Sequence, residues 1–291
     1  MTKAESDDPI PHAIYAGERV ALLTQHGKER VLGPALEHAV GCRVEHVTGY
    51  DTDLLGTFTR DISRAGTQSE TARKKASVGM ELSGLLLGIA SEGSFGPDPY
   101  IGMFPWNIEL IIWMDNERNL EVVGIGEGKT NFNHLLTGEW AAAQAFAREV
   151  QFPGHHLVVR PDGKDGTYIC KGIASWQDLE RAFSRALTRS SNGLVLIETD
   201  MRASANPTRM EVIGLAAEDL AHKLRSLCPA CGTPGFWRVG RVPGLQCSAC
   251  GTPTSETRAE TFGCLKCPYH DTRDIADTTS APPSICDYCN P

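Results

Sequence analysis

The sequence predicts an α/β protein with a mixed, largely parallel sheet flanked by helices, followed by a small C-terminal zinc-ribbon-like domain. The first observation is the strand–helix–strand order of residues 19–47, which is typical of a βαβ unit. The second is the short apolar run of residues 85–90, which is bounded by glycine and indicates a fully buried strand. The third is a change of character at Cys228, where long apolar stretches stop and cysteine, glycine and proline take over.

The composition sets the broad class of protein. With 291 residues, of which 41% are hydrophobic, the chain can hold one large and one small globular domain. The net charge of −8 implies no general attraction to nucleic acid or to an anionic membrane. No apolar run approaches the ~20 residues of a membrane span, and the first residues lack the apolar segment of a secretory signal. We therefore expect a cytoplasmic protein with no membrane partner.

The first βαβ unit accounts for the start of the predicted α/β domain. Residues 19–24 are mostly apolar and predict a strand, and residues 29–40 carry apolar side chains at helical spacing. Gly41 is a natural helix stop, and residues 42–47 alternate like a second strand.

The middle of the α/β domain continues with one helix and three strands. Residues 68–82 predict a helix with Ser69 as its cap, and the buried strand of residues 85–90 follows. Residues 108–114 and 120–125 predict a pair of strands around a polar turn.

The last part of the α/β domain alternates helices and short strands. Helical spacing predicts helices over 139–150, 176–188 and 209–225, the last of them announced by Asn206-Pro207, a cap followed by proline. Apolar runs predict strands over 156–160, 167–171 and 194–198. We accordingly expect a flexible tail over 1–12, an α/β domain over 13–226 that is catalytic or ligand-binding, and a zinc domain over 227–291.

Three polar segments that follow predicted strands are candidates for a site. In open α/β sheets ligands lie beyond the carboxyl ends of strands. Glu92, which follows the apolar run of residues 85–90, is the first candidate, and an ordinary exposed loop acid is the alternative. The turn at residues 24–29 leads into a helix whose N-terminus can seat a phosphate, although such Gly-Lys turns are often structural. The third segment is residues 198–202.

These segments, with the helix of residues 68–82, suit phosphoryl chemistry assisted by Mg²⁺ or Mn²⁺, because carboxylates hold the metal while cations offset phosphate charge. We predict that Glu92 and Glu70 hold the metal or position water, and that Lys28 and Lys75 bind phosphates. Arg202 is expected to contact the substrate. The ligand-binding residues predicted around them are Thr24, His26, Gly27, Glu29 and Asp200.

The C-terminal region predicts two structural zinc ions. Its eight cysteines form four Cys-x-x-Cys pairs, and four thiolates satisfy one tetrahedral zinc. The spacing leaves open whether the pairs combine sequentially or interleave. The predicted ligands are Cys228, Cys231, Cys247, Cys250, Cys264, Cys267, Cys286 and Cys289.

The charge of this tail argues against a nucleic-acid partner. From residue 225 on, the chain contains six Lys and Arg residues and six Asp and Glu residues, so its formal charge is zero before the thiolates are counted. Phosphate backbones require a positive surplus. A protein partner docking on the zinc domain, or a purely structural role, is the expectation.

Residues 19–95 resemble the inosine/xanthosine triphosphate pyrophosphatases. The resemblance rests on Thr24-x-x-x-Lys28-Glu29, on Gly56-Thr57-Phe58, and on Glu70-Thr71-Ala72-x-x-Lys75-Ala76. The first motif lacks the family's asparagine, Thr71 replaces another, and the Ser-His-Arg base-recognition motif is absent. The whole chain looks closer to a family of uncharacterised bacterial proteins with an α/β domain and a paired Cys-x-x-Cys tail.

Two functions follow from this reading. The first is a Mg²⁺-dependent hydrolase of a nucleotide or other phosphorylated small molecule, with a structural zinc tail. The alternative is a non-enzymatic, ligand-sensing adaptor whose zinc domain docks a protein partner.

Overall fold

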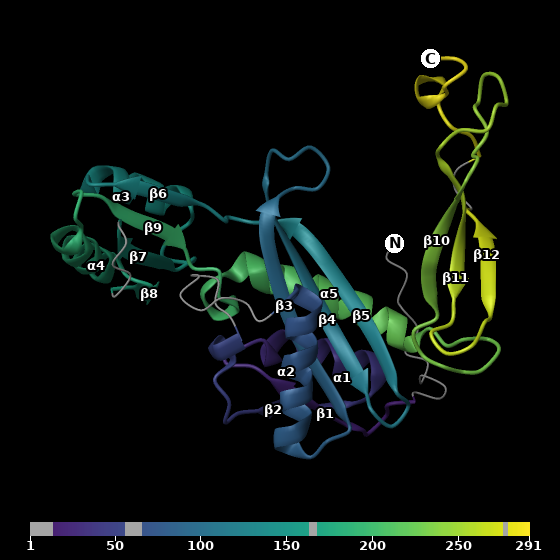
Figure 1. Ribbon diagram of the computed structural model, residues 1–291, viewed down its shortest axis with the longest axis horizontal. Coiled ribbons are helices and arrows are strands. Elements are labelled where there is room, and N and C mark those ends of the chain that lie inside the picture. Colours follow the sequence, from purple (N-terminus) through teal and green to yellow (C-terminus); the bar gives the residue numbers. More distant parts are fainter. Residues whose placement is uncertain (1–13, 56–65, 163–167, 276–278) are drawn as a thin grey trace, which may run out of the picture. The chain divides into compact units, whose positions relative to one another are not determined.

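The computed structural model describes residues 14–55, 66–162, 168–275 and 279–291 (Figure 1). The chain divides into two compact units, and the boundary along the chain falls between Ala221 and His222, within helix α5 (Pro207–Arg225). The domain bounds predicted from the sequence stay a prediction. The predicted tail over 1–12 and the Gly56-Thr57-Phe58 segment lie outside the described residues.

The first sheet of the N-terminal unit has five strands in the order β2-β1-β3-β4-β5, and it is mixed as predicted. β1 pairs in parallel with β2 and β3, while β3, β4 and β5 form an antiparallel meander. Its elements are β1 (Arg19–Leu23), α1 (Glu29–Val40), β2 (Arg43–Val47), a 3₁₀ turn at Thr52–Leu55, α2 (Gln68–Ser83), β3 (Leu87–Pro97), β4 (Pro105–Asp115) and β5 (Leu120–Lys129).

Helices cover both faces of this sheet. Helix α2 packs its buried Val78 and Met80 against Ala21 and Leu23, and Figure 1 shows α1 on the opposite side of the strands. Helix α5 runs across β5, where Gly124 and Gly126 make room for it. A Cβ at Gly126 would lie 2.5 Å from the backbone nitrogen of Ala216, so a larger residue would push the helix off the sheet.

Strand β3 is longer than the apolar run indicated. The strand continues through residues 91–97, and Glu92 pairs with Leu110 in its middle. Glu92 is not the exposed loop acid that the sequence allowed as the alternative, because only 5% of Glu92 is exposed. Residues 87–90 of the apolar run begin β3, where Ala90 packs against Ala72 and Ala76 of α2. The polar residues that follow stay in the strand because β4 supplies their hydrogen-bonding partners.

A second sheet in the same unit is antiparallel, with the order β6-β9-β7-β8. Helices α3 and α4 share one hydrophobic core with it (Figure 1). The predicted segment at 198–202 follows β9, so it leaves this second sheet and not the sheet that holds β1 and β3. The elements are β6 (His134–Thr137), α3 (Trp140–Glu149), β7 (Leu157–Pro161), β8 (Cys170–Ile173), α4 (Trp176–Arg189), β9 (Val195–Thr199) and a 3₁₀ turn at Ala203–Ala205.

The five predicted helices are all present, with ends within two residues of the predicted ones. Gly41 ends α1 in a left-handed conformation, with φ of 73°. The predicted cap of α2 was wrong. Thr67 caps this helix in a capping box with Glu70, and Ser69 lies in the first turn.

The C-terminal unit is built on a three-stranded antiparallel sheet in the order β10-β11-β12. The strands are β10 (Trp237–Pro243), β11 (Thr257–Gly263) and β12 (His270–Asp274), followed by a 3₁₀ turn at Pro283–Ile285. The ring of Phe236 packs against the tilted rings of Phe262 and Tyr269, at centroid distances of 6.2 and 5.7 Å. Across the described residues of both units, no helix combines the length and apolarity needed to cross a membrane.

Candidate anion site and zinc centres

The carboxyl end of β1 is a topological switch point. From β1 the chain passes through α1 to β2 on one side, and it returns through α2 to β3 on the other side. The pairing of β1 with β3 ends at Leu22 and Ile89, so β3 projects beyond its neighbour. In open α/β sheets, such switch points are where ligands bind.

Lys28 lies at this switch point, at the N-cap of α1. Its Nζ donates to the backbone oxygen of Ser91 at 2.6 Å and lies 3.4 Å from the Ser91 hydroxyl. Burial and the charge of Arg209 lower the pKa of Lys28 to about 7, against the opposing effect of Glu92 and Glu109. A second side chain, Gln68, donates to the backbone oxygen of Glu92 at 2.6 Å. Side chains from the N-terminal ends of α1 and α2 therefore both bond to the projecting part of β3.

The carboxylate of Glu92 forms an ion pair with Lys75 of α2. Both side chains are largely buried, with 6% and 13% exposed. Burial alone would raise the pKa of Glu92, but the charges of Lys75 and Lys28 outweigh it and hold the pKa below its usual value. The α2 helix and β3 therefore bring together two of the residues that the sequence singled out.

A second buried ion pair, which sequence reasoning missed, joins Glu109 of β4 to Arg209 of α5 at 2.7 Å. Both side chains are almost completely buried. The Ser91 hydroxyl donates to the other oxygen of Glu109 at 3.2 Å, and Asn107 donates to the first at 3.2 Å. Asn206 caps α5 by accepting from the Arg209 amide. The one sequence signal was the Asn206-Pro207 cap, which places Arg209 in the first turn.

Five charges thus gather at the switch point. We call Lys28, Lys75, Arg209, Glu92 and Glu109 the switch-point cluster. Below pH 7, where Lys28 is protonated, three cations and two carboxylates give it a formal charge of +1. All five come from residues that are buried or largely buried, where charge interactions are screened less than at the surface. The cluster suits an anion.

The predicted ligand-binding residues of the first turn lie beside Lys28. Thr24 is buried, and its hydroxyl accepts from the His26 amide at 3.3 Å. Gly27 has φ of +71°, a conformation that favours glycine, and this turn directs the chain into α1. One carboxylate oxygen of Glu29 is buried without a hydrogen-bonding partner. The ligand-binding roles of these residues stay predictions.

The other predicted residues make structural contacts. Glu70 accepts hydrogen bonds from the Thr67 amide and hydroxyl, each at 2.8 Å, and these bonds lower its pKa. Arg202 donates to Asp200 at 2.7 Å, and Asp200 also accepts from the Gly172 amide at 3.0 Å. Asp200 therefore links the segment after β9 to β8, and Arg202 pairs with it. Their predicted roles, and that of Glu70, stay predictions.

The carboxylates do not form a ready-made magnesium cage. Among the described residues, the groups of three or more potential ligands within reach of one ion consist of cysteines alone. Glu92 and Glu109 are each engaged by a cation. The residues present therefore do not fit a preformed Mg²⁺ or Mn²⁺ site.

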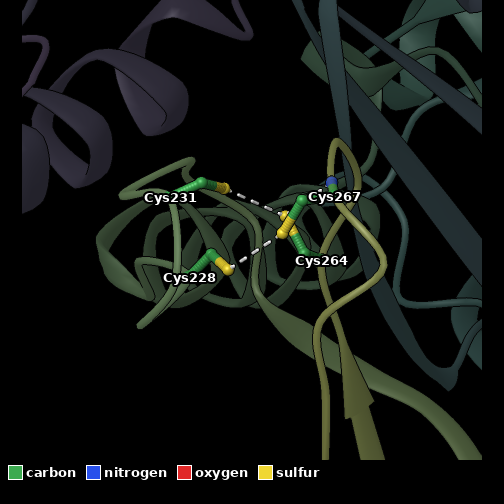
Figure 2. Close-up of side chains that lie close together, drawn as sticks. All are labelled: Cys228, Cys231, Cys264 and Cys267. Atoms are coloured by element: carbon green, nitrogen blue, oxygen red, sulfur yellow. Dashed lines mark hydrogen bonds between the residues drawn. The ribbon is translucent and has the colours of Figure 1, made fainter.

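The C-terminal unit holds two cysteine tetrads, each of which could hold a zinc ion. In each tetrad the four sulfur atoms lie within 4.8 Å of one another. Figure 2 shows the first tetrad, with Sγ–Sγ distances of 3.7 Å for Cys228–Cys267 and 3.6 Å for Cys231–Cys264. The structure thus answers the question that spacing left open, because the pairs interleave. The tetrads are Cys228, Cys231, Cys264 and Cys267, and Cys247, Cys250, Cys286 and Cys289.

The topology explains the interleaving. Cys231 precedes β10, and Cys264 follows the antiparallel strand β11, so both lie at one end of the sheet. Cys250 and Cys286 lie beyond the opposite strand ends. A zinc ion bound by each tetrad would therefore cross-link one end of this small sheet, whose own hydrophobic core is limited.

Two near-identical Cys-x-x-Cys-Gly turns, here called knuckles, supply half of the ligands. Cys228-Pro-Ala-Cys-Gly-Thr-Pro and Cys247-Ser-Ala-Cys-Gly-Thr-Pro differ at one position. Gly232 and Gly251 have φ of 71° and 73°, and their amides donate to the oxygens of Cys228 and Cys247. This repeat is a sequence signal that the two knuckles occupy equivalent places in different tetrads.

The thiols are arranged to ionise around a cation. Hydrogen bonds with the hydroxyl and then the backbone of Thr233 lower the pKa of Cys231 to about 6, and Thr252 does the same for Cys250. Within the second tetrad, Cys250 and then burial raise the pKa of Cys289 to about 12. Four thiolates this close repel one another, so a divalent cation is what permits them to ionise together.

The fold and sites define an α/β protein with a tail that carries two potential tetracysteine zinc centres. The family model described as "Domain of unknown function (DUF6671)" matches residues 75–291, and the chain belongs to this family. No curated protein and no solved structure matches the chain. The resemblance to the triphosphate pyrophosphatases has no support from these comparisons.

Proposed function

We propose that the N-terminal unit binds a phosphorylated small molecule at the switch-point cluster and hydrolyses it, with a nucleotide as the first class to test. The observation that carries the proposal is the cluster of Lys28, Lys75 and Arg209 around two carboxylates at the carboxyl end of β1. Its surplus positive charge lies where ligands bind in this class of sheet.

A phosphate is the anion that this site suits best. Lys28 lies at the N-cap of α1, where the helix dipole also favours negative charge. A bound dianion would stabilise the charged form of Lys28, which burial otherwise disfavours. The other cations are already oriented by Glu92 and Glu109, so little reorganisation accompanies binding.

The proposed catalytic group is Glu92. Its carboxylate is held ionised by Lys75, so it can orient or deprotonate a water near a phosphate that Lys28 and Lys75 hold. A divalent metal would neutralise charge on the phosphates and would arrive with the substrate, since the protein itself offers no preformed cage. Arg209 would contribute through its charge and by holding Glu109 in place.

The test is a hydrolysis assay of zinc-loaded protein against nucleoside triphosphates and pyrophosphate, with Mg²⁺ or Mn²⁺. Released phosphate and pyrophosphate are measured separately for wild type, Glu92→Gln and the control Glu121→Gln. Glu121 is a carboxylate of the same sheet that pairs with Arg73 at the surface, away from the cluster. We expect turnover in wild type and control and its loss in Glu92→Gln, with circular dichroism showing that the variants fold.

Turnover that survives in folded Glu92→Gln would refute the catalytic role of Glu92. Binding without turnover would favour the alternative of a ligand-sensing adaptor whose zinc unit docks a partner. Ligand-induced thermal stabilisation separates these outcomes, because a ligand that binds only the folded state raises the apparent stability whether or not it reacts.

A further inference from the structure

A groove between α3 and α4 is separate from the switch-point cluster. Both helices pack on the second sheet through a common core that contains Ala143, Phe146, Leu179 and Phe183. Beside this core the helices leave an open groove of about 450 Å³, which is within the range of small-molecule sites. It is lined by Trp140, Gln144, Arg148, Trp176, Gln177 and Glu180.

Two tryptophans form the aromatic part of the groove. Trp140 and Trp176 are the first residues of α3 and α4, and each is partly exposed. Phe183 braces Trp140 at a centroid distance of 5.5 Å, and Phe152 braces Trp176 edge-on at 4.9 Å. Both indoles are therefore anchored to the core while part of their surface faces the groove. Indole faces stack well on flat rings.

The polar side chains of the groove can form hydrogen bonds with a ligand. Gln144 and Gln177 each offer a donor and an acceptor, and neither amide bonds to another residue in the described part of the chain. Arg148 lies over the Trp176 ring at 5.4 Å, and Glu180 lies on the facing helix. One positive and one negative side chain give the lining a net charge of zero.

We propose that this groove binds an uncharged, planar, heteroaromatic ligand of the nucleobase type, as the free base or the nucleoside. The indoles would stack on the ring, and the two amides would bond to donors and acceptors at its edge. A neutral lining gives no advantage to a phosphate, so the nucleoside should bind at least as tightly as its monophosphate. This site is independent of the proposed function at the switch-point cluster.

The experiment is equilibrium dialysis of the full-length protein with each common nucleoside and its 5′-monophosphate, with tryptophan fluorescence recorded in parallel. Gln144→Met removes one amide and keeps the length of the side chain. Glu149→Met, at an exposed position of the same helix outside the groove, is the matched control. Trp140→Phe keeps an aromatic ring against Phe183 and removes one indole.

We expect saturable binding of at least one nucleoside, with fluorescence quenching that falls in Trp140→Phe. The affinity should drop about tenfold in Gln144→Met, as for the loss of hydrogen bonds, and stay unchanged in Glu149→Met. Three results would overturn the proposal: no nucleoside binding by folded protein, equal affinity in the two methionine variants, or binding that requires the phosphate. The last result would assign the ligand to a cationic site instead.

Discussion

The tight packing around Gly93 predicts a large effect of a single methyl group. Gly93 lies in β3 beside the pair formed by Glu109 and Arg209. A Cβ at this position would lie 2.9 Å from Cδ of Glu109 and 2.8 Å from Nη2 of Arg209. Neither side chain can move aside easily, because both are buried and hydrogen-bonded. Gly93→Ala therefore forces the ion pair or the strand to shift.

The size of the effect can be worked out against a control in the same strand. Overpacking a core destabilises a protein by about 1–3 kcal/mol, whereas replacing a strand glycine by alanine stabilises it by about 0.5–1 kcal/mol. Since the clash falls on a buried charge pair, we expect Gly93→Ala to lower the free energy of unfolding by about 2 kcal/mol. Gly96 has open space around its Cβ position, so Gly96→Ala should be neutral or slightly stabilising.

Equilibrium urea unfolding, followed by circular dichroism, measures both variants. If Gly93→Ala proved as stable as Gly96→Ala, then the buried packing of Glu109 and Arg209 against β3 would be wrong. The same variant should bind a phosphate ligand more weakly, because its cations are displaced.

Three further predictions address the pH response, the zinc centres and a helix cap. The pKa of Lys28 is about 7 in the folded chain and 10.5 ordinarily, so between these pH values the unfolded chain holds a proton that the folded chain has lost. The free energy of unfolding of wild type relative to Lys28→Met should therefore rise with pH across this window. A difference between the two proteins that does not change with pH would contradict this prediction. Metal analysis should find two zinc ions per chain, falling to one in the double variant Cys228→Ser/Cys264→Ser; a loss of both would indicate sequential pairing. Thr67→Ala should destabilise the protein by about 1 kcal/mol and Ser69→Ala by less, in thermal or urea unfolding.

Much of the fold could be predicted because its signals are local. The apolar spacing of residues 29–40 and the glycine that follows determine α1 and its end without reference to the rest of the chain. The Asn206-Pro207 pair announces α5 in the same way. The Cys-x-x-Cys pairs were equally explicit, because the chemistry of thiolates leaves few alternatives.

What could not be predicted depends on contacts between distant residues. Ser91 and Glu92 look like a loop in the sequence, but β4 pairs with them and Lys75 neutralises the carboxylate, so they remain buried in a strand. Glu109 and Arg209 are 100 residues apart, and nothing near either one indicates the other. The pairing of the cysteines likewise follows from the antiparallel sheet, which the tail's few apolar residues did not reveal.

The most direct test of the anion site is calorimetric titration of wild type, Lys28→Met and Arg30→Met with pyrophosphate below pH 7. Arg30 is a matched control, since it is a cation in the first turn of the same helix whose side chain is 83% exposed. We predict that wild type and Arg30→Met bind pyrophosphate equally and that folded Lys28→Met loses at least about tenfold in affinity. Equal binding by all three proteins, or no binding by wild type, would contradict a phosphate site at the switch-point cluster.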